Sequence, residues 1–331
     1  LRQSTYPENP VRPSRRPLRI ITRKSHLAQV QANAVAQVLA QLHRDTEIQV
    51  ITTESQGDRV LDRSLADIGG KGLFSQSLEQ ALLNHEADVA VHCLKDLPTQ
   101  TTSGLLLTAV IARGPIEDVL VTSDARKLES LAHGATIGTS SPRRTAQLKR
   151  LRPDLDIRLL RGNIETRLAR VLEGDTLDAA VLARAGLERL KIACDCYSVI
   201  DVEQMLPAAA QGALALQCRA DDHVTMRRCL GLNDPKTSLE VGVERSIVDM
   251  LHADCHSPIA VLAESDGAQQ LRLRAMVMSL DATESAEIDI IGDTNDTHAL
   301  LEESRVALSA QNAVEILQRA SATHRDLAPS S

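Results

Sequence analysis

A lysine and an aspartate stand side by side where an apolar segment ends. The segment ADVAVHCLKDLPT, residues 87–99, finishes its apolar run and then delivers Lys95 and Asp96 just before Pro98. Open parallel sheets bind ligands at the carboxyl ends of their strands, and a carboxylate there can transfer protons or stabilise a cation. The alternative is a solvated surface ion pair, which contributes little. The local sequence leaves both interpretations open.

Two arginines lie in the first turn of a predicted helix within GTSSPRR, residues 138–144. The helix dipole opposes positive charge at this end by about 0.3–1 kcal/mol per charge. A bound anion would reverse that penalty, and the planar guanidinium groups of Arg143 and Arg144 suit a carboxylate. The alternative is a solvated helix start in which Ser141 is an ordinary N-cap.

More basic residues follow in the same part of the chain. In LRGN, residues 160–163, Arg161 ends a predicted strand, and Arg167 lies in the next helix. Residues 139–170 contain nine Lys or Arg against three acidic residues, although the whole chain of 331 residues has a formal charge of −7. A local cationic patch on an acidic protein favours a small anionic ligand over a long polymer.

Two further motifs have weaker signals. The glycines of GGKG, residues 69–72, allow close approach of a ligand to the backbone before a helix. The P-loop pattern GxxxxGK[ST] is absent. Lys71 is therefore open to two interpretations, a ligand-binding lysine or a surface lysine. Cys255, in HADCHSPI, can be a zinc ligand, a nucleophilic thiol or a small core residue. The zinc spacing matches no common site and lacks a second ligand pair, so we predict no metal.

The elements that must position these residues alternate between strand and helix. Apolar strands are predicted at 18–23, 48–53 and 87–94, and a helix capped by Ser25 follows the first. The order begins again after residue 116, with a helix that has Pro142 in its first turn. Such alternation indicates two α/β domains with mostly parallel sheets. From about residue 232 antiparallel strands and a closing helix predict a small α+β domain.

Composition excludes several classes of function. Aromatic residues make up only 1% of the chain and Trp is absent, which argues against binding single-stranded nucleic acid by base stacking. No apolar run approaches the roughly 20 residues of a membrane span. Residues 1–17 are polar and proline-rich without an apolar h-region, and we expect a disordered extension. We therefore expect a cytoplasmic protein that binds neither nucleic acid nor membrane.

The ordered set of motifs from about residue 18 to 260 resembles the porphobilinogen deaminase (hydroxymethylbilane synthase) family. The motifs are RIITRKS, GGKGLF, VHCLKDLPT, GTSSPRRTAQL, RLLRGNIETRL, AGLERL, QGAL and CHSPI. Each is modest by itself, but their order is specific, and the resemblance covers nearly all of the chain that we expect to be ordered.

The resemblance implies a monomer with two doubly wound, periplasmic-binding-protein-like α/β domains flanking a cleft, plus the small α+β domain. Domain 1 would comprise residues 18–115 and 203–231, domain 2 residues 116–202, and domain 3 residues 232–331. It also implies a transferase of tetrapyrrole and heme biosynthesis. Porphobilinogen would lose ammonia to give an electrophilic azafulvene, and head-to-tail coupling would build the linear tetrapyrrole hydroxymethylbilane on a dipyrromethane primer.

The resemblance also implies roles for individual residues. Cys255 would hold the dipyrromethane cofactor through a thioether, and Asp96 would be the catalytic carboxylate facing the pyrrole N–H groups. Because every pyrrole unit carries an acetate and a propionate, several cations are needed. Cofactor carboxylates would meet Lys95, Thr139, Ser141, Arg143 and Arg144. Substrate or the growing chain would meet Arg23, Ser25, Lys71, Phe74, Arg161, Arg167, Arg189 and Gln211.

Four motifs depart from the family pattern. Cys93 replaces the serine of VHS[ML]KD, Ala253-Asp254 replaces the two glycines before the cofactor cysteine, Ala210 replaces the first glycine of GQG, and FSQSLE replaces FSKELE. These changes motivate one rival, an inactive relative that binds an anionic ligand. A second rival is a two-lobed binding protein, which would need neither Cys255 nor Asp96. Since Asp96, Cys255 and the Arg143–Arg144 pair are retained, we expect an active enzyme.

Overall fold

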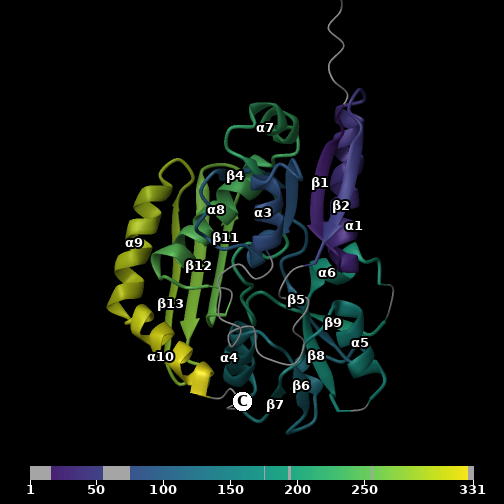
Figure 1. The fold of residues 1–331 in the computed structure, drawn as a ribbon. Coiled ribbons are helices and arrows are strands. Elements are labelled where there is room, and N and C mark those ends of the chain that lie inside the picture. The colour runs from purple at the N-terminus through teal and green to yellow at the C-terminus, as the bar shows by residue number, and fades with distance from the viewer. Residues whose placement is uncertain (1–15, 55–74, 175, 193–194, 255, 327–331) are drawn as a thin grey trace, which may run out of the picture.

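The computed structural model describes residues 16–54, 75–174, 176–192, 195–254 and 256–326. These residues form three sheets, two of five strands and one of three. Figure 1 shows the two larger sheets one above the other, with the smallest sheet alongside them. No helix among these residues is both long enough and apolar enough to cross a membrane.

The first sheet has the strand order β2-β1-β3-β10-β4. β1 pairs in parallel with β2 and β3, whereas β10 runs antiparallel to both β3 and β4. Four of the five strands therefore point the same way, as the βαβ pattern predicts. Its strands and helices are β1 (Leu18–Arg23), α1 (His26–Leu42), β2 (Ile48–Thr53), α3 (Gln76–Leu83), β3 (Val89–Cys93), the 3-10 turn η1 (Leu94–Asp96), β4 (Leu105–Ile111), β10 (Leu214–Arg219) and α7 (His223–Leu230).

The second sheet repeats this plan in the order β7-β6-β8-β5-β9, with β5 as its reversed strand. Its elements are β5 (Asp118–Val121), the 3-10 turn η2 (Leu128–Ser130), β6 (Thr136–Gly138), α4 (Pro142–Leu151), β7 (Asp156–Arg158), α5 (Ile164–Leu172), β8 (Ala179–Ala183), α6 (Arg184–Arg189) and β9 (Tyr197–Ile200).

The chain crosses between these two sheets twice, once before β5 and once before β10. At the crossing Gly212 has a φ of 87°, and a Cβ there would lie 2.6 Å from the carbonyl oxygen of Gly114. Only glycine fits so close an approach in the left-handed region. The two connections therefore pass directly against each other between the sheets.

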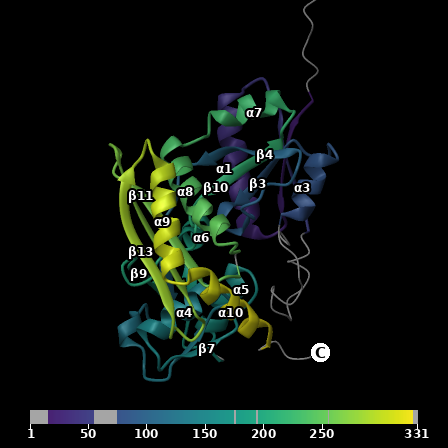
Figure 2. The same cartoon turned by 90° about the vertical axis from the view of Figure 1, so that its left-hand side faces the viewer.

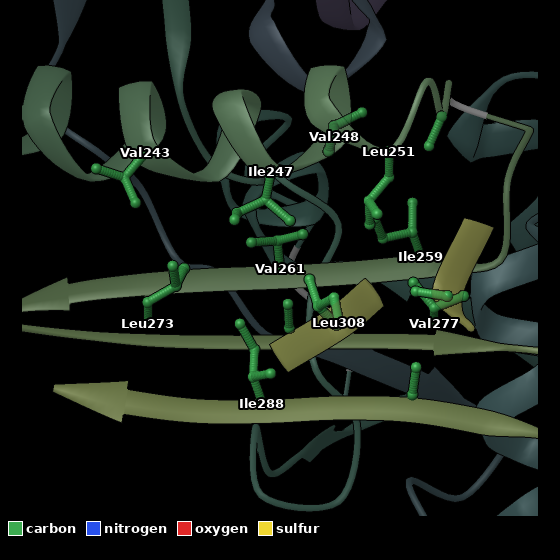
Figure 3. Packing of buried hydrophobic residues seen from close by; sticks show 14 of the residues in the cluster. Val243, Ile247, Val248, Leu251, Ile259, Val261, Leu273, Val277, Ile288 and Leu308 are labelled. Carbon is green, nitrogen blue, oxygen red and sulfur yellow. The ribbon is translucent and has the colours of Figure 1, made fainter. Parts of the chain in front are cut away.

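The third sheet is antiparallel in the order β11-β12-β13 and packs against helices. Figure 3 shows Val243 and Ile247 of one helix above Leu273 and Val261 of the sheet. Figure 2 shows α4 of the second domain beside this sheet. Its elements are α8 (Pro235–Met250), β11 (Ile259–Ser265), β12 (Gln270–Met278), β13 (Ser285–Asp293), α9 (Thr297–Ala310) and α10 (Ala313–Asp326).

The fold class predicted from the sequence is confirmed: two α/β domains and a small α+β domain. Ser25 caps α1 and Pro142 starts α4, also as predicted. The third domain has more elements than the pattern indicated, because β11 and α9 were not predicted. The strand β11 is buried over most of its length, so it lacks the alternation that marks a half-buried strand.

Candidate active site

The Lys95–Asp96 pair lies on a short turn that is anchored on both sides. β3 ends at Cys93, and the turn η1 follows directly. Leu94 and Leu97 are 0% and 7% exposed, and they pack with Val241 of α8. The buried leucines fix the turn, and Lys95 and Asp96 remain partly exposed between them.

Asp96 shares a cavity with Arg23, which the resemblance assigns to the incoming substrate. Gln31, Ser75 and Cys93 line the same cavity. Arg23 is the last residue of β1 and Asp96 follows β3, and these two strands are parallel neighbours. Their carboxyl ends therefore meet at one edge of the first sheet, which is where open α/β sheets bind ligands.

Arg143 and Arg144 converge on a buried carboxylate, Asp118. Arg143 Nη2 donates to Asp118 Oδ2 at 2.7 Å, and Arg144 Nη2 donates to Oδ1 at 2.8 Å. Burial by itself would raise the pKa of Asp118, but the two guanidinium groups lower it well below its usual range. The other terminal nitrogens donate to the carbonyl oxygens of Leu206 and Val181. Both arginines are thereby held rigidly at the start of α4.

Gln211 connects this cluster to Lys95. Its Nε2 donates to Asp118 Oδ1 at 3.0 Å, and its Oε1 accepts from Lys95 Nζ at 3.2 Å. Gln211 is fully buried. Burial lowers the pKa of Lys95, and the neighbouring Asp96 partly offsets this shift. One hydrogen-bonded chain therefore joins the predicted catalytic turn to the two arginines.

Further cations gather around the same place. Burial, together with repulsion from Arg144 and Arg161, lowers the pKa of Arg167 to about 10, and Asp96 acts in the opposite direction. Arg189 donates to the carbonyl oxygen of Gly212, and its charge also acts on Cys93. The structure thus brings Arg161, Arg167 and Arg189 into the electrostatic surroundings of the turn.

The cluster fits a ligand with several carboxylates. Lys95, Arg143, Arg144, Arg161 and Arg167 contribute five cations, against the two carboxylates of Asp96 and Asp118. Within the described residues, the buried Nε atoms of Arg143 and Arg144 also have no hydrogen-bond acceptor. A dipyrromethane group with acetate and propionate arms would supply the missing negative charge.

The predicted hydroxyl residues are placed as helix caps. Ser141 Oγ accepts from Arg144 N at 3.4 Å, and Thr139 Oγ1 accepts from Ser141 N at 3.2 Å. Ser25 Oγ accepts from Ala28 N at 3.4 Å. The ordinary capping interpretation is therefore correct for Ser25 and Ser141. Capping leaves each hydroxyl hydrogen able to donate to a ligand.

Three predicted site residues, Lys71, Phe74 and Cys255, lie outside the described residues. The residue before Cys255 is described, and its carboxylate closes a local turn. Asp254 Oδ1 accepts from His256 N at 2.9 Å and from Ser257 Oγ at 3.0 Å. Asp254, which replaces a family glycine, thus supports the loop. Among the described residues of this loop, His252 is left-handed, with a φ of 53°.

Several residues of the site were not predicted. Asp118 carried a signal, since it is a charged residue at the start of a wholly apolar strand, DVLV. Gln31 carried none, because a glutamine in a helix is ordinary. In the structure, Cys93 Sγ donates to Gln31 Oε1 at 3.3 Å. Burial raises the pKa of the Cys93 thiol, and the nearby charge of Asp96 raises it further.

Comparison with known proteins identifies the family. The family model described as "Porphobilinogen deaminase, dipyromethane cofactor binding domain" matches residues 18–227, and "Porphobilinogen deaminase, C-terminal domain" matches residues 238–308. The porphobilinogen deaminase of Xanthomonas axonopodis pv. citri is 43% identical over 91% of this chain and 98% of its own length. That of Sphingopyxis alaskensis is 44% identical over 81% of this chain and 86% of its own length.

Solved structures align less closely. The BenM effector-binding domain with benzoate is 13% identical with a TM-score of 0.39, covering 66% of this chain and 95% of that one. The periplasmic VFT2 domain of Bordetella pertussis BvgS is 16% identical with a TM-score of 0.35, covering 61% and 75%. The match of both family models, with the near full-length identity to curated relatives, shows that the chain belongs to the porphobilinogen deaminase family.

Proposed function

We propose that the cavity beside η1 is the place where porphobilinogen is deaminated and joined head to tail into hydroxymethylbilane, with Asp96 as the catalytic carboxylate. The observation that carries this assignment is that Asp96 and Arg23 line one cavity at the carboxyl ends of parallel strands. Arg167 interacts electrostatically with Asp96 and with Arg144 and Arg161, and this group of cations would provide the positive charge that an acidic substrate needs.

The cofactor would be held in two ways. Cys255 would attach it through a thioether, and its carboxylates would be bound by Lys95, Thr139, Ser141, Arg143 and Arg144. When bound, the dipyrromethane group supplies a nucleophilic pyrrole carbon from which the chain grows. Arg143 and Arg144 each keep N–H groups that the described protein atoms do not accept, and a rigid guanidinium loses little entropy on binding a carboxylate. Asp118 keeps both side chains in place for this task.

Asp96 would act on the charge that develops in the pyrrole rings. Loss of ammonia and ring coupling both pass through cationic pyrrole species, and a carboxylate close to the ring N–H groups stabilises them and relays protons. Arg23, Ser25, Lys71, Arg161, Arg167, Arg189 and Gln211 would orient the acetate and propionate arms, and Phe74 would pack on a ring. The partly buried position of the turn limits access of water to the reacting atoms.

The domain boundaries, the oligomeric state and the cellular location are also proposals. Domain 1 would contain residues 18–115 and 203–231, domain 2 residues 116–202, and domain 3 residues 232–331. Support comes from β10, which returns to the first sheet after the second is complete. We also propose that the enzyme is monomeric and cytoplasmic, which size-exclusion chromatography with light scattering and cell fractionation would test.

The decisive variant is Asp96→Asn, with Asp156→Asn as the matched control. Asp156 is an exposed aspartate of β7 that pairs with Arg158. We expect Asp96→Asn to lower turnover of porphobilinogen by about 100-fold or more, while its melting temperature and its cofactor content stay at the wild-type level. The control should retain full turnover. Ordinary turnover by the Asp96→Asn enzyme would refute the assignment.

A further inference from the structure

The turn that carries Asp96 is held by one arginine of the third domain. Arg245, in α8, donates to four carbonyl oxygens of the turn: from Nη1 to Leu94 at 3.4 Å and Leu97 at 2.9 Å, and from Nη2 to Pro98 at 2.6 Å and Thr99 at 3.3 Å. The carbonyl oxygen of Leu94 also accepts from Leu97 N at 3.2 Å, so the guanidinium matters most for the carbonyls of Leu97, Pro98 and Thr99, since buried backbone groups are rarely left unpaired. A single guanidinium therefore organises the backbone on both sides of Asp96.

A second contact, a side-chain hydrogen bond, joins the segment after Asp96 to α8 one helical turn beyond Arg245. Thr99 Oγ1 donates to Asp249 Oδ1 at 2.8 Å. Residues four apart lie on the same face of a helix, so Arg245 and Asp249 meet the turn together. Burial lowers the pKa of Arg245, and the charge of Asp249 acts against that shift.

The opposite face of α8 is locked to the third domain. Val243, Ile247 and Val248 of α8, with Leu251 directly after the helix, pack into the core above the sheet (Figure 3). α8 ends at Met250, and Cys255 follows five residues later in the chain. One rigid helix thus holds the turn of Asp96 with one face and, through its own end, leads into the segment that contains Cys255.

We propose that Arg245 is a positioning residue that acts on the reaction through Asp96: it fixes the catalytic turn of the first domain to the helix that precedes the cofactor-bearing cysteine of the third. This inference rests on the proposed function. Arg245 contacts backbone oxygens and not the reacting atoms, so its removal should displace the carboxylate without removing it. A displacement of about 1 Å at a catalytic group can cost on the order of 100-fold in rate.

The identity of the residue matters for this role. Arginine presents five donors in a planar fork, so its two terminal nitrogens can reach four carbonyls at once. The ammonium of lysine has three donors on one atom and cannot span the same set. Arg245→Lys should therefore keep part of these four contacts, and Arg245→Met should keep none of them.

The test compares Arg245→Met and Arg245→Lys with Arg274→Met as control. Arg274 is 5% exposed, belongs to the same domain, and pairs with Glu203 and Glu264 away from the turn. We expect Arg245→Met to lower kcat by about 10- to 100-fold with KM within threefold of wild type, and Arg245→Lys to recover part of the loss. Arg274→Met should lower the melting temperature and leave kcat within threefold.

A double-mutant cycle separates action through Asp96 from a general loss of structure. In an Asp96→Glu enzyme the carboxylate is already displaced, so adding Arg245→Met should cost at most threefold more. Equal losses in both backgrounds, or a kcat for Arg245→Met within threefold of wild type, would overturn the proposal. If Arg245→Met does not fold, the same cycle is run with Arg245→Lys, for which an equal loss in both backgrounds, or no loss, overturns it.

Hydrogen exchange gives a readout independent of activity. Amides of residues 94–99 should exchange faster in Arg245→Met than in Arg274→Met, and unchanged exchange would contradict the proposed contact. A wild-type enzyme that does not consume porphobilinogen would overturn the proposed function, while the exchange result would still report whether Arg245 holds the turn.

Discussion

Replacement of Asp118 by asparagine should destabilise the protein strongly, although Asp118 lies outside the proposed catalytic turn. The carboxylate is fully buried and accepts from Arg143, Arg144 and Gln211 at 2.7, 2.8 and 3.0 Å. A neutral amide at this position would leave two buried guanidinium groups without a counter-charge, and removal of one member of a buried ion pair costs about 3–5 kcal/mol. With an unfolding entropy of roughly 2.1 cal/mol/K per residue, that corresponds in a chain of 331 residues to a fall in Tm of roughly 4–7 °C.

Differential scanning calorimetry or fluorimetry would measure this change at pH 7.5. Asp289→Asn is the control, because Asp289 forms an exposed cross-strand pair with Arg272 that contributes little to stability. The arginines hold the pKa of Asp118 well below its ordinary value of 3.8, so its contribution should persist down to about pH 4 and disappear only at lower pH. A Tm for Asp118→Asn within 2 °C of wild type would refute the view that this carboxylate anchors the arginine pair.

Three further outcomes follow from described contacts. Burial lowers the pKa of His92 from an ordinary 6.5 to about 4, and the charge of Glu79 acts in the opposite direction. The free energy of unfolding should therefore have its full value above about pH 6.5 and be about 2 kcal/mol lower at pH 5. A His92→Gln variant whose denaturation curves show the same pH slope as wild type would contradict this. Cys93→Ser should keep kcat within about twofold of wild type, because serine can still donate a hydrogen bond to Gln31. Cys93→Ala removes that donor and should lower the free energy of unfolding in urea by about 1 kcal/mol. Equal stability of the two variants would count against the hydrogen bond. Asp254→Gly should reduce the fraction of protein that carries the cofactor, measured by intact mass. Asp254→Asn should not, because asparagine keeps the oxygen that accepts from His256 N and Ser257 Oγ. Identical cofactor loading of the two variants would argue that Asp254 does not support the loop.

Local pattern was sufficient to predict the elements that carry the site. The apolar run before Lys95 marks a strand end, and the hydroxyl before Pro142 marks a helix start; each is a short-range effect of backbone chemistry. The alternation of strands and helices then limits the topology to parallel units, which brings the strand ends to one edge of the sheet.

Long-range pairing could not be predicted in the same way. The partner of Arg143 is separated from it by 25 residues, and Arg245 lies about 150 residues from the turn that it holds. No periodicity relates such positions, because they meet only after the sheets have formed and the domains have packed. A charge inside a buried strand, such as Asp118 before Val119, does indicate that some partner must exist, but not which one.

We propose that this chain builds its product on a dipyrromethane primer that is attached to Cys255 and whose ring nitrogens face Asp96. Intact mass spectrometry of the purified full-length chain, followed by mapping of the peptide that contains Cys255, tests it most directly. We expect the protein to be heavier than its sequence by one dipyrromethane group, with the added mass on that peptide. Protein that consumes porphobilinogen but has the bare sequence mass, or carries the group on another residue, would contradict the account.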